Sequence, residues 1–315
     1  MPLSRVVAKG LLGLCVAAGL GACSRGGESG AAPEVRAAAA ARIVPANTAA
    51  AEFLACLLGD EGAGRVAAMP EQVDAYSIFD FRRAPWSTPQ RFPRYAAEAL
   101  IALHPDLVVA HEWQSRDTTE VLRAQGIPLI VLRSARDYGD VRDTLSSLGR
   151  ALGIEDRAAA AVAALDRRVD EIRLGAGRRQ GLRALEYTND GTGGWTAGKD
   201  TTADAMIRLA GMRNAAADAG LSGHVALDVE RLITIDPDVL VVGTPARDEE
   251  GSATKSVLEG TPALANLAAV RGRRIVVLPS ALLSSDSPCL VDAAERLASL
   301  VDRLETAGAP APKKP

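Results

Sequence analysis

Aromatic residues are concentrated in a few segments that follow predicted strands. The chain has only eleven aromatic residues (Trp 3, Tyr 4, Phe 4). Six of them fall in or near these segments: Tyr76, Phe79, Phe81, Trp86, Trp113 and Trp195. Large planar ligands are held by aromatic walls that carry a few polar groups. The distribution therefore predicts a site for a large organic ligand, such as a corrin or a catecholate chelate.

The candidate ligand-binding residues combine these aromatics with nearby polar side chains. In open α/β sheets, ligands bind beyond the carboxyl ends of the strands, so residues in the loops that follow strands are the candidates. They are Asn47, Thr48, Tyr76, His111, Trp113, Gln114, Trp195, Thr196 and His224. We expect Trp113 and Trp195 to lie in loops and to face one another across a cleft.

Catalytic motifs are weak in this sequence. The run Gly193–Asp200 satisfies seven positions of a phosphate-binding loop, but Asp200 stands where a Ser or Thr must ligate magnesium. The chain has no Gly-x-Ser-x-Gly elbow and no His-Glu-x-x-His pair. We predict no catalytic residues and no cofactor. An extracytoplasmic hydrolase and a cell-surface adhesin remain less favoured alternatives.

A receptor for a bare divalent metal is a further alternative. His111, Glu112 and His224 are the residues that could bind such an ion. A metal site needs three or four converging ligands, and the chain has only three histidines. His104 falls in a Pro-Asp turn away from the predicted cleft, so a metal chelate is favoured over a bare ion.

The N-terminal residues predict an exported, lipid-anchored protein. Arg5 and Lys9 precede the apolar run Leu11–Leu20, which is the pattern of a signal peptide over residues 1–22. The segment 20–23 (Leu-Gly-Ala-Cys) resembles the bacterial lipobox, and this resemblance implies cleavage before Cys23 and its lipidation. Residues 23–41 lack apolar periodicity and predict a flexible tether. The protein is therefore expected outside the cytoplasm, attached to a membrane.

Composition excludes some functions. Apolar residues make up 48% of the 315-residue chain, which is enough for a sizeable core. The net charge of −3 comes from interspersed acids and bases, so no basic stripe for nucleic acid is predicted.

Two cysteines, Cys56 and Cys289, remain after processing and lipidation. The sequence leaves open whether they form a disulfide or are separate buried thiols.

The pattern of short apolar strands, turns and helices predicts an α/β fold of two Rossmann-like lobes with mainly parallel sheets. Continuous apolar runs at 106–110 and 128–132 are typical of buried parallel strands. Thr48 is the expected N-cap of the first helix, and residues 64–68 form an expected strand. One long helix without Pro or Gly joins the lobes. The predicted divisions are the N-terminal lobe at 42–153, the linking helix at 154–177, the C-terminal lobe at 178–306 and a disordered tail at 307–315.

Several motifs resemble the periplasmic binding proteins of iron and cobalamin importers, a family whose lobes are joined by a single long helix. The resemblance covers about 42–304 and is greatest to the cobalamin-binding members. It rests on RIVPANTAAAEF at 42–53, ALHPDLVVA at 102–110, GIPLIVL at 126–132, TAGKDTTADAMIRLAGMRN at 196–214 and LDVERLITIDPDVLVVG at 227–243. The chain departs from the family in Ala49–Ala51 and in a longer segment, Phe79–Arg94.

The resemblance implies a monomeric, non-enzymatic receptor that captures cobalamin, haem or a ferric siderophore and delivers it to an ABC permease with its ATPase. It also implies one carboxylate on each lobe that meets arginines of the permease. Glu230 matches this position in the second lobe. Asp117 is the first candidate in the first lobe, with Glu120 and Glu52 as alternatives.

Overall fold

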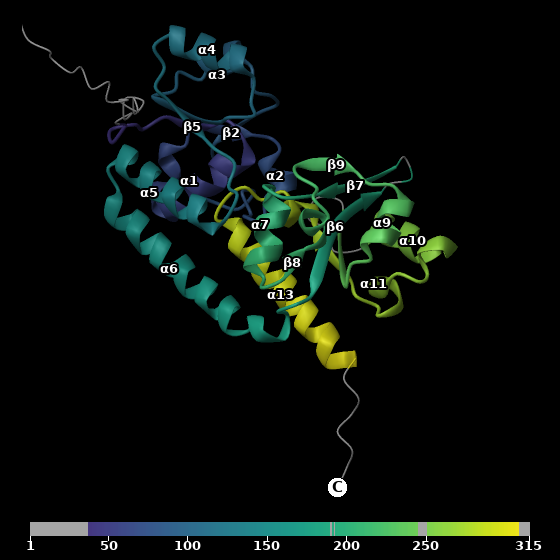
Figure 1. The fold of residues 1–315 in the computed structure, drawn as a ribbon. Coiled ribbons are helices and arrows are strands. Elements are labelled where there is room, and N and C mark those ends of the chain that lie inside the picture. Colours follow the sequence, from purple (N-terminus) through teal and green to yellow (C-terminus); the bar gives the residue numbers. More distant parts are fainter. Residues whose placement is uncertain (1–36, 190, 192, 245–250, 309–315) are drawn as a thin grey trace, which may run out of the picture. The chain divides into compact units, whose positions relative to one another are not determined.

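The computed structural model describes residues 37–189, 191, 193–244 and 251–308. The predicted signal peptide, Cys23, most of the tether and the tail from residue 309 lie outside these residues. Among the helices that are described, none is both long and apolar enough to cross a membrane. The predicted α/β fold with largely parallel sheets is confirmed (Figure 1).

The first half of the chain is built on short parallel strands. β1 (Ile43–Pro45), β4 (Leu107–His111) and β5 (Leu129–Leu132) form a parallel sheet in the order β1-β4-β5. β2 (Ala68–Pro70) and β3 (Gln90–Phe92) form a separate parallel pair. The helices between them are α1 (Thr48–Gly62), α2 (Val73–Tyr76), α3 (Ala97–Ile101), α4 (Arg116–Ala124) and α5 (Tyr138–Leu152).

Both faces of this sheet are buried, which explains the continuous apolar runs in the sequence. Leu107 and Val109 pack in one core with α1 and α5. Val108 and Ala110 point the other way and pack with Leu122 of α4 and residues of α3. Figure 1 shows α1 and α5 on one side of the strands and α3 and α4 on the other.

α6 (Glu155–Leu174) leads from the first half of the chain to the second. The second half contains β6 (Arg183–Asn189), β7 (Gly194–Ala197), β8 (Arg213–Asn214), β9 (His224–Ala226), β10 (Val239–Thr244) and β11 (Ile275–Pro279). Strand order is β11-β10-β6-β7-β9, with β8 beside β6. The pairs of β7 with β6 and β9 are antiparallel, and the other pairs are parallel.

The helices of the second half are α7 (Thr202–Leu209), α8 (Ala215–Asp218), α9 (Val229–Ile235), α10 (Ala253–Gly260), α11 (Ala268–Arg271), α12 (Ser280–Leu283) and α13 (Cys289–Gly308). α13 packs against α6 and α7. One apolar core continues from Leu54 of α1 through Leu165 of α6 to Leu297 of α13. This shared core couples the two predicted lobes; their exact boundaries stay predictions.

Three local expectations are corrected by the structure. Asn47, not Thr48, caps α1, because its Oδ1 accepts a hydrogen bond from the Ala50 backbone N at 2.8 Å. Residues 63–65 form a 3₁₀ turn, so the expected strand at 64–68 begins only at Ala68. β7 and β9 occupy segments that were expected to be loops or the approach to a helix.

Candidate functional site

A cavity of about 1200 Å³ is lined by residues from both halves of the chain. The first half contributes the segment after β1, residues near α2 and the segments after β3, β4 and β5. The second half contributes the sheet formed by β6, β7 and β9, the start of α7 and the segment 280–286. Six predicted ligand residues line this cavity: Asn47, Thr48, Tyr76, Trp113, Gln114 and His224.

Asn47 and Gln114 are bound to each other and to the backbone. Asn47 Nδ2 donates to Gln114 Oε1 at 3.1 Å, and Gln114 Nε2 donates to the Ala46 carbonyl at 2.8 Å. Gln114 Oε1 also accepts the backbone N–H of His111 at 2.9 Å. These contacts join the loop after β1 to the loop after β4. They fix the shape of the wall and leave little free hydrogen-bonding capacity for a ligand.

His111 lies behind this wall and does not line the cavity, which corrects its prediction as a ligand-binding residue. It is the last residue of β4 and is 2% exposed. Its Nε2 is 2.9 Å from Asp286 Oδ2, although neither ring nitrogen forms a hydrogen bond with a described residue. Its ring packs beside Trp113, with centroids 5.2 Å apart. His111 thus supports Trp113, which is 64% exposed and lines the cavity.

The opposite wall is the antiparallel part of the second sheet, formed by β6, β7 and β9. Trp195 and Thr196 are neighbours on β7 and point to opposite faces of it. Trp195 pairs with Thr188 of β6, and Ala197 pairs with His224 of β9. Cross-strand partners share a face, so Trp195 is on the face of Thr188, Ala197 and His224, which line the cavity. Trp195 is exposed but is not part of the lining, so its contact with a ligand stays a prediction.

Thr196 points to the other face of that sheet. It is 1% exposed, and its Oγ1 donates to the Glu186 carbonyl at 2.6 Å. Its assignment to the ligand site is therefore corrected. The loop expected around Trp195 and Thr196 is strand β7, and alternation along a strand sends adjacent side chains to opposite faces.

Part of the aromatic cluster belongs to the core. Phe81 and Trp86 are buried, and Phe79 packs against the same core. The ring of Phe81 contacts those of Phe79 and Trp86, with centroids 5.8 Å apart in each pair. Trp86 Nε1 donates to Asp60 Oδ1 at 2.9 Å. These three residues shape the long segment before β3 and do not line the cavity.

Four acidic residues line the cavity and were not predicted as ligand residues: Asp200, Asp286, Glu52 and Glu186. Glu52 of α1 accepts Ser77 Oγ at 2.6 Å and Ser287 Oγ at 2.5 Å, and burial raises its pKa from 4.5 to about 7. Glu186 of β6 accepts Thr188 Oγ1 at 2.9 Å, and burial raises its pKa to about 7 also. An acid inside an otherwise apolar helix face or strand is the sequence signal that could have found Glu52 and Glu186.

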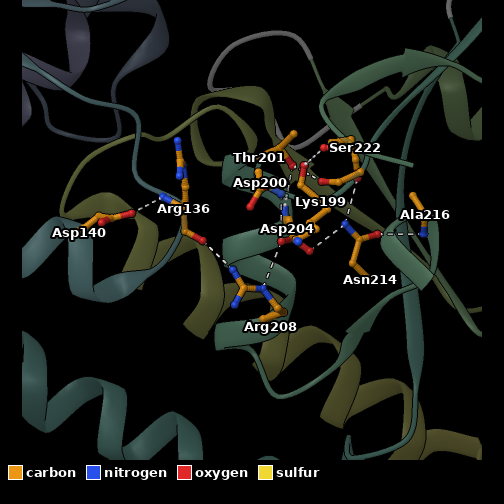
Figure 2. Close-up of polar contacts among 12 residues, drawn as sticks. Arg136, Asp140, Lys199, Asp200, Thr201, Asp204, Arg208, Asn214, Ala216 and Ser222 are labelled. Carbon is orange, nitrogen blue, oxygen red and sulfur yellow. Dashed lines mark hydrogen bonds and ion pairs between the residues drawn. The ribbon is translucent and has the colours of Figure 1, made fainter. Parts of the chain in front are cut away.

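Asp204 fixes the cavity loop at the start of α7 (Figure 2). This buried carboxylate accepts Asn214 Nδ2 at 3.1 Å, Arg208 Nε at 3.2 Å and the backbone N of Asp200 at 3.4 Å. Arg208 also donates to the carbonyl of Arg136, at 2.6 Å, in the segment before α5. The network therefore ties the loop at 198–201 to the first half of the chain.

The glycine in this loop has a structural reason. A Cβ at Gly198 would overlap the backbone of Leu221. The resemblance of Gly193–Asp200 to a phosphate-binding loop is thus accounted for by close packing between β7 and the segment before β9. Asp200 also lines the cavity, and its carboxylate would repel a phosphate held by the 193–200 loop itself.

The candidate docking acids are exposed. Asp117 lies in the first turn of α4 and Glu230 in the first turn of α9, and neither forms an ion pair with a described residue. Glu120 pairs with Arg116 at 3.0 Å. Glu52 is buried and lines the cavity, so the structure removes it from the alternatives for docking.

Cys56 and Cys289 are free thiols. Cys56 is half-buried, and burial raises its pKa to about 11. Cys289 is buried, and burial raises its pKa well above the usual value of a thiol. These thiols are therefore poor nucleophiles. Within the described ranges, no group of three or more His, Cys, Asp or Glu side chains could hold a metal ion.

The profile of the periplasmic binding protein family matches residues 70–282, which is more than half of the chain. The chain belongs to the periplasmic binding protein family. This binding protein is 30% identical over 203 residues to a cobalamin-binding protein of Halobacterium salinarum, across 64% of its own length and 54% of that relative. It thus matches about half the length of this curated relative. It is also 26% identical over 210 residues to an uncharacterised ABC transporter substrate-binding lipoprotein of Bacillus subtilis, across 65% of this chain and 64% of that one.

Solved structures share the fold of this periplasmic binding protein. A periplasmic haem-binding protein in complex with two haems superposes with a TM-score of 0.71 at 28% identity, covering 85% of this chain and 99% of the other. A haem-binding protein from Roseiflexus sp. RS-1 gives 0.68 at 26% identity, covering 82% and 98%. The vitamin B12-binding protein of Vibrio cholerae gives 0.66 at 16% identity, covering 84% and 98%, and shows the fold alone.

Proposed function

We propose that this protein is the substrate-binding lipoprotein of an ABC importer and that it captures a metal-chelate nutrient in the cavity between its lobes. A corrinoid such as cobalamin is the first candidate. The observation that carries the proposal is the cavity itself. Its volume of about 1200 Å³ exceeds the roughly 300–1000 Å³ of sites for drug-sized ligands. A chelate larger than a drug molecule fits this space, whereas a bare ion would leave it unfilled.

The cavity walls favour a corrinoid over an anionic chelate. Tyr76 and Trp113 offer aromatic surface from the first lobe. The second lobe presents hydroxyl groups of Thr188, Thr202 and Ser284, together with carboxyl groups. A corrin ring carries amide side chains that can hydrogen-bond to these groups. A ferric catecholate carries negative charge, which Asp200 and Glu186 would repel when ionised.

Haem is the second candidate. It is favoured by the two haem-binding relatives, whose identities of 26% and 28% exceed that of the vitamin B12-binding structure. The phenol of Tyr76 and the imidazole of His224 both line the cavity, and either group can bind ferric iron. The haem propionates would be repelled by the carboxyl groups of the second lobe, although Arg94 on the first-lobe side could pair with one of them.

Delivery requires a permease and its ATPase, and we assign the docking acids to it. Asp117 and Glu230 each lie exposed at the start of a helix, one in each lobe. Carboxylates in such positions can pair with arginines of a partner, while the deeper cavity holds the ligand. Rim charges chiefly steer association and set its register.

The membrane anchor is also part of the proposal. Cys23 would be lipidated after removal of residues 1–22, and residues 23–36 would tether the receptor. The predicted tether extended to residue 41, but Ala37 and Ala40 are buried in the core and the Ala37 N–H donates to the Ala151 carbonyl at 2.7 Å. A fatty-acid analogue should label the wild type and not a Cys23→Ala variant in cells. Labelling of the variant to the wild-type level would exclude this anchor.

Isothermal titration against five ligands tests the proposed cargo: cobalamin, haem, a ferric catecholate, a ferric hydroxamate and zinc. We expect saturable one-to-one binding of cobalamin with the highest affinity in the panel. Preferred binding of haem would transfer the assignment to the second candidate. Binding of zinc alone, or of none of the five, would contradict a receptor for a metal chelate.

A further inference from the structure

Arg94 is a cation on the first-lobe side of the cavity. It lies between β3 and α3, at the end of the long segment in which this chain departs from the family pattern. Its side chain is exposed and lines the cavity, and no described residue forms an ion pair or hydrogen bond with its guanidinium. Neighbouring Arg91 differs, because it binds both oxygens of Asp74 at 2.9 and 3.0 Å. Arg91 is thus structural, whereas Arg94 is available to a ligand.

The second-lobe side of the cavity carries the opposite charge. Asp200 and Glu186 line it, and neither carboxylate is paired with a cation among the described residues. Asp200 has a φ of +65°, a left-handed conformation that side chains rarely adopt. Asp204 holds it there by accepting its backbone N–H, as Figure 2 shows. Such strained positions cluster at ligand sites, where surrounding contacts maintain them.

Among the described lining residues, Arg94 is thus the cation of the first-lobe side, and Asp200 and Glu186 are carboxyl groups of the second-lobe side without a cationic partner. Glu52, the first-lobe carboxyl group of the lining, already accepts hydrogen bonds from Ser77 and Ser287. A ligand that carries an anionic group at one end and hydrogen-bond donors at the other fits in one orientation only. Cobalamin has this arrangement, because its nucleotide loop contains a phosphodiester while the edge of its corrin ring carries amides. An arginine fork suits phosphate oxygens in charge and geometry.

Building on the proposed corrinoid cargo, we propose that Arg94 binds the nucleotide-loop phosphodiester of the ligand and that Asp200 and Glu186 receive the amide edge of its corrin ring. Arg94 is then the residue that distinguishes a complete corrinoid from one without a nucleotide loop. In this arrangement, the long segment Phe79–Arg94 serves to bring the guanidinium of Arg94 to the cavity.

Cobalamin and cobinamide separate the two halves of this proposal, because cobinamide keeps the amide-bearing ring but lacks the phosphodiester. Titrations would use the full-length protein and four variants: Arg94→Gln, Arg94→Lys, Asp200→Asn and the control Arg82→Gln. Arg82 is an exposed arginine of the same lobe that pairs with Asp80 and does not line the cavity.

We expect Arg94→Gln to weaken cobalamin binding about tenfold and to change cobinamide binding less than about twofold. Arg94→Lys should recover part of the loss, because it keeps the charge without the fork. Asp200→Asn should weaken both ligands equally, and Arg82→Gln neither. The cobalamin loss should shrink at high salt, as expected for a charge pair.

The proposal is overturned if Arg94→Gln affects both corrinoids alike or neither of them while the wild type binds cobalamin. The proposed orientation of the ligand is overturned if Asp200→Asn weakens the binding of cobalamin but not that of cobinamide, which is the effect expected of Arg94→Gln. A wild-type protein that binds haem and no corrinoid would reject the proposed cargo instead, so the two failures are distinguishable.

Discussion

Glu52 is a carboxyl group buried where the two lobes meet. Its oxygens accept hydrogen bonds from Ser77 of the first lobe and from Ser287, which precedes α13. These contacts favour the ionised carboxylate, but burial outweighs them and raises the pKa to about 7. Folding therefore costs more when this group must be ionised.

We predict a stability that depends on the Glu52 proton. Between pH 4.5 and about 7 the folded protein keeps a proton that the unfolded chain has released. The free energy of unfolding thus falls as pH rises through this window, by on the order of 3 kcal/mol for this group, and then levels off. Urea denaturation from pH 4.5 to 8 should show this fall reduced in Glu52→Gln. The exposed Glu98→Gln variant should retain it, and equal profiles for both variants would refute the assignment.

Trp113 is the predicted aromatic residue that we most expect to contact the ligand. It is exposed, lines the cavity and is supported from behind by His111. We predict that Trp113→Ala weakens ligand binding by about 1–3 kcal/mol, as for the loss of a buried aromatic contact. Trp195→Ala should have a smaller effect, because Trp195 lies outside the lining. Titration of both variants tests the ranking, and a larger loss for Trp195→Ala would reverse it.

At the scale of elements, the loop before α7 depends on a buried acid. Asp204 is bound by Asn214, Arg208 and the backbone of Asp200 (Figure 2). We predict that Asp204→Ala lowers the free energy of unfolding by about 2–3 kcal/mol, because it leaves buried donors without an acceptor. Asp140→Ala, which removes an exposed acceptor of the Arg136 N–H, should cost less than about 1 kcal/mol. Denaturant titration that finds equal losses would contradict a special role for Asp204.

The elements that sequence predicts well are those with strong local patterns. Apolar runs predict β4, β5 and β10 because these strands are buried on both faces. The predicted boundary between the N-terminal lobe and the linking helix, after residue 153, coincides with Gly153, which ends α5 in the αL conformation that glycine adopts at low cost. β7 and β9 were missed because each has only a few residues and is defined by its neighbours, not by its own pattern.

The candidate site was predicted only in part, for the same reason. Tyr76 and Trp113 stand out as aromatics after strands or turns, and both line the cavity. Thr196 and His111 were also predicted from their positions near strand ends, but neither lines the cavity. Alternation along β7 turns Thr196 to the other face, and His111 is buried at the end of β4. Arg94 reaches the cavity only through tertiary packing, which local sequence does not encode, whereas Glu186 carries the signal of an acid within an apolar strand.

At the scale of the whole molecule, hydrogen bonds and a shared apolar core join the two predicted lobes and limit their motion relative to one another. Glu52 binds Ser287, Arg208 binds the Arg136 carbonyl, and one apolar core runs through α1, α6 and α13. Burial of each large apolar side chain in such a core contributes roughly 1.5–3 kcal/mol. Ligand capture is therefore expected to close the lobes only slightly.

We predict that the docking acids act in delivery and not in capture. A Glu230→Lys, Asp117→Lys double variant should bind the ligand as the wild type does, because both side chains are exposed and outside the cavity lining. Uptake by cells should fall, and more steeply at low salt, where charges are least screened. Unimpaired uptake would remove the docking role, whereas lost ligand binding would mean that these helices border the site.

A corrinoid is expected to bind in the cavity between the lobes. Thr188 is exposed on β6 and lines that cavity, whereas Thr234 is exposed on α9 and does not. Equilibrium titration with cobalamin should give one-to-one binding for the wild type and for Thr234→Trp. Binding should fall at least tenfold in Thr188→Trp, whose indole would fill part of the cavity. Undiminished binding by Thr188→Trp, or no binding by the wild type, would contradict the account.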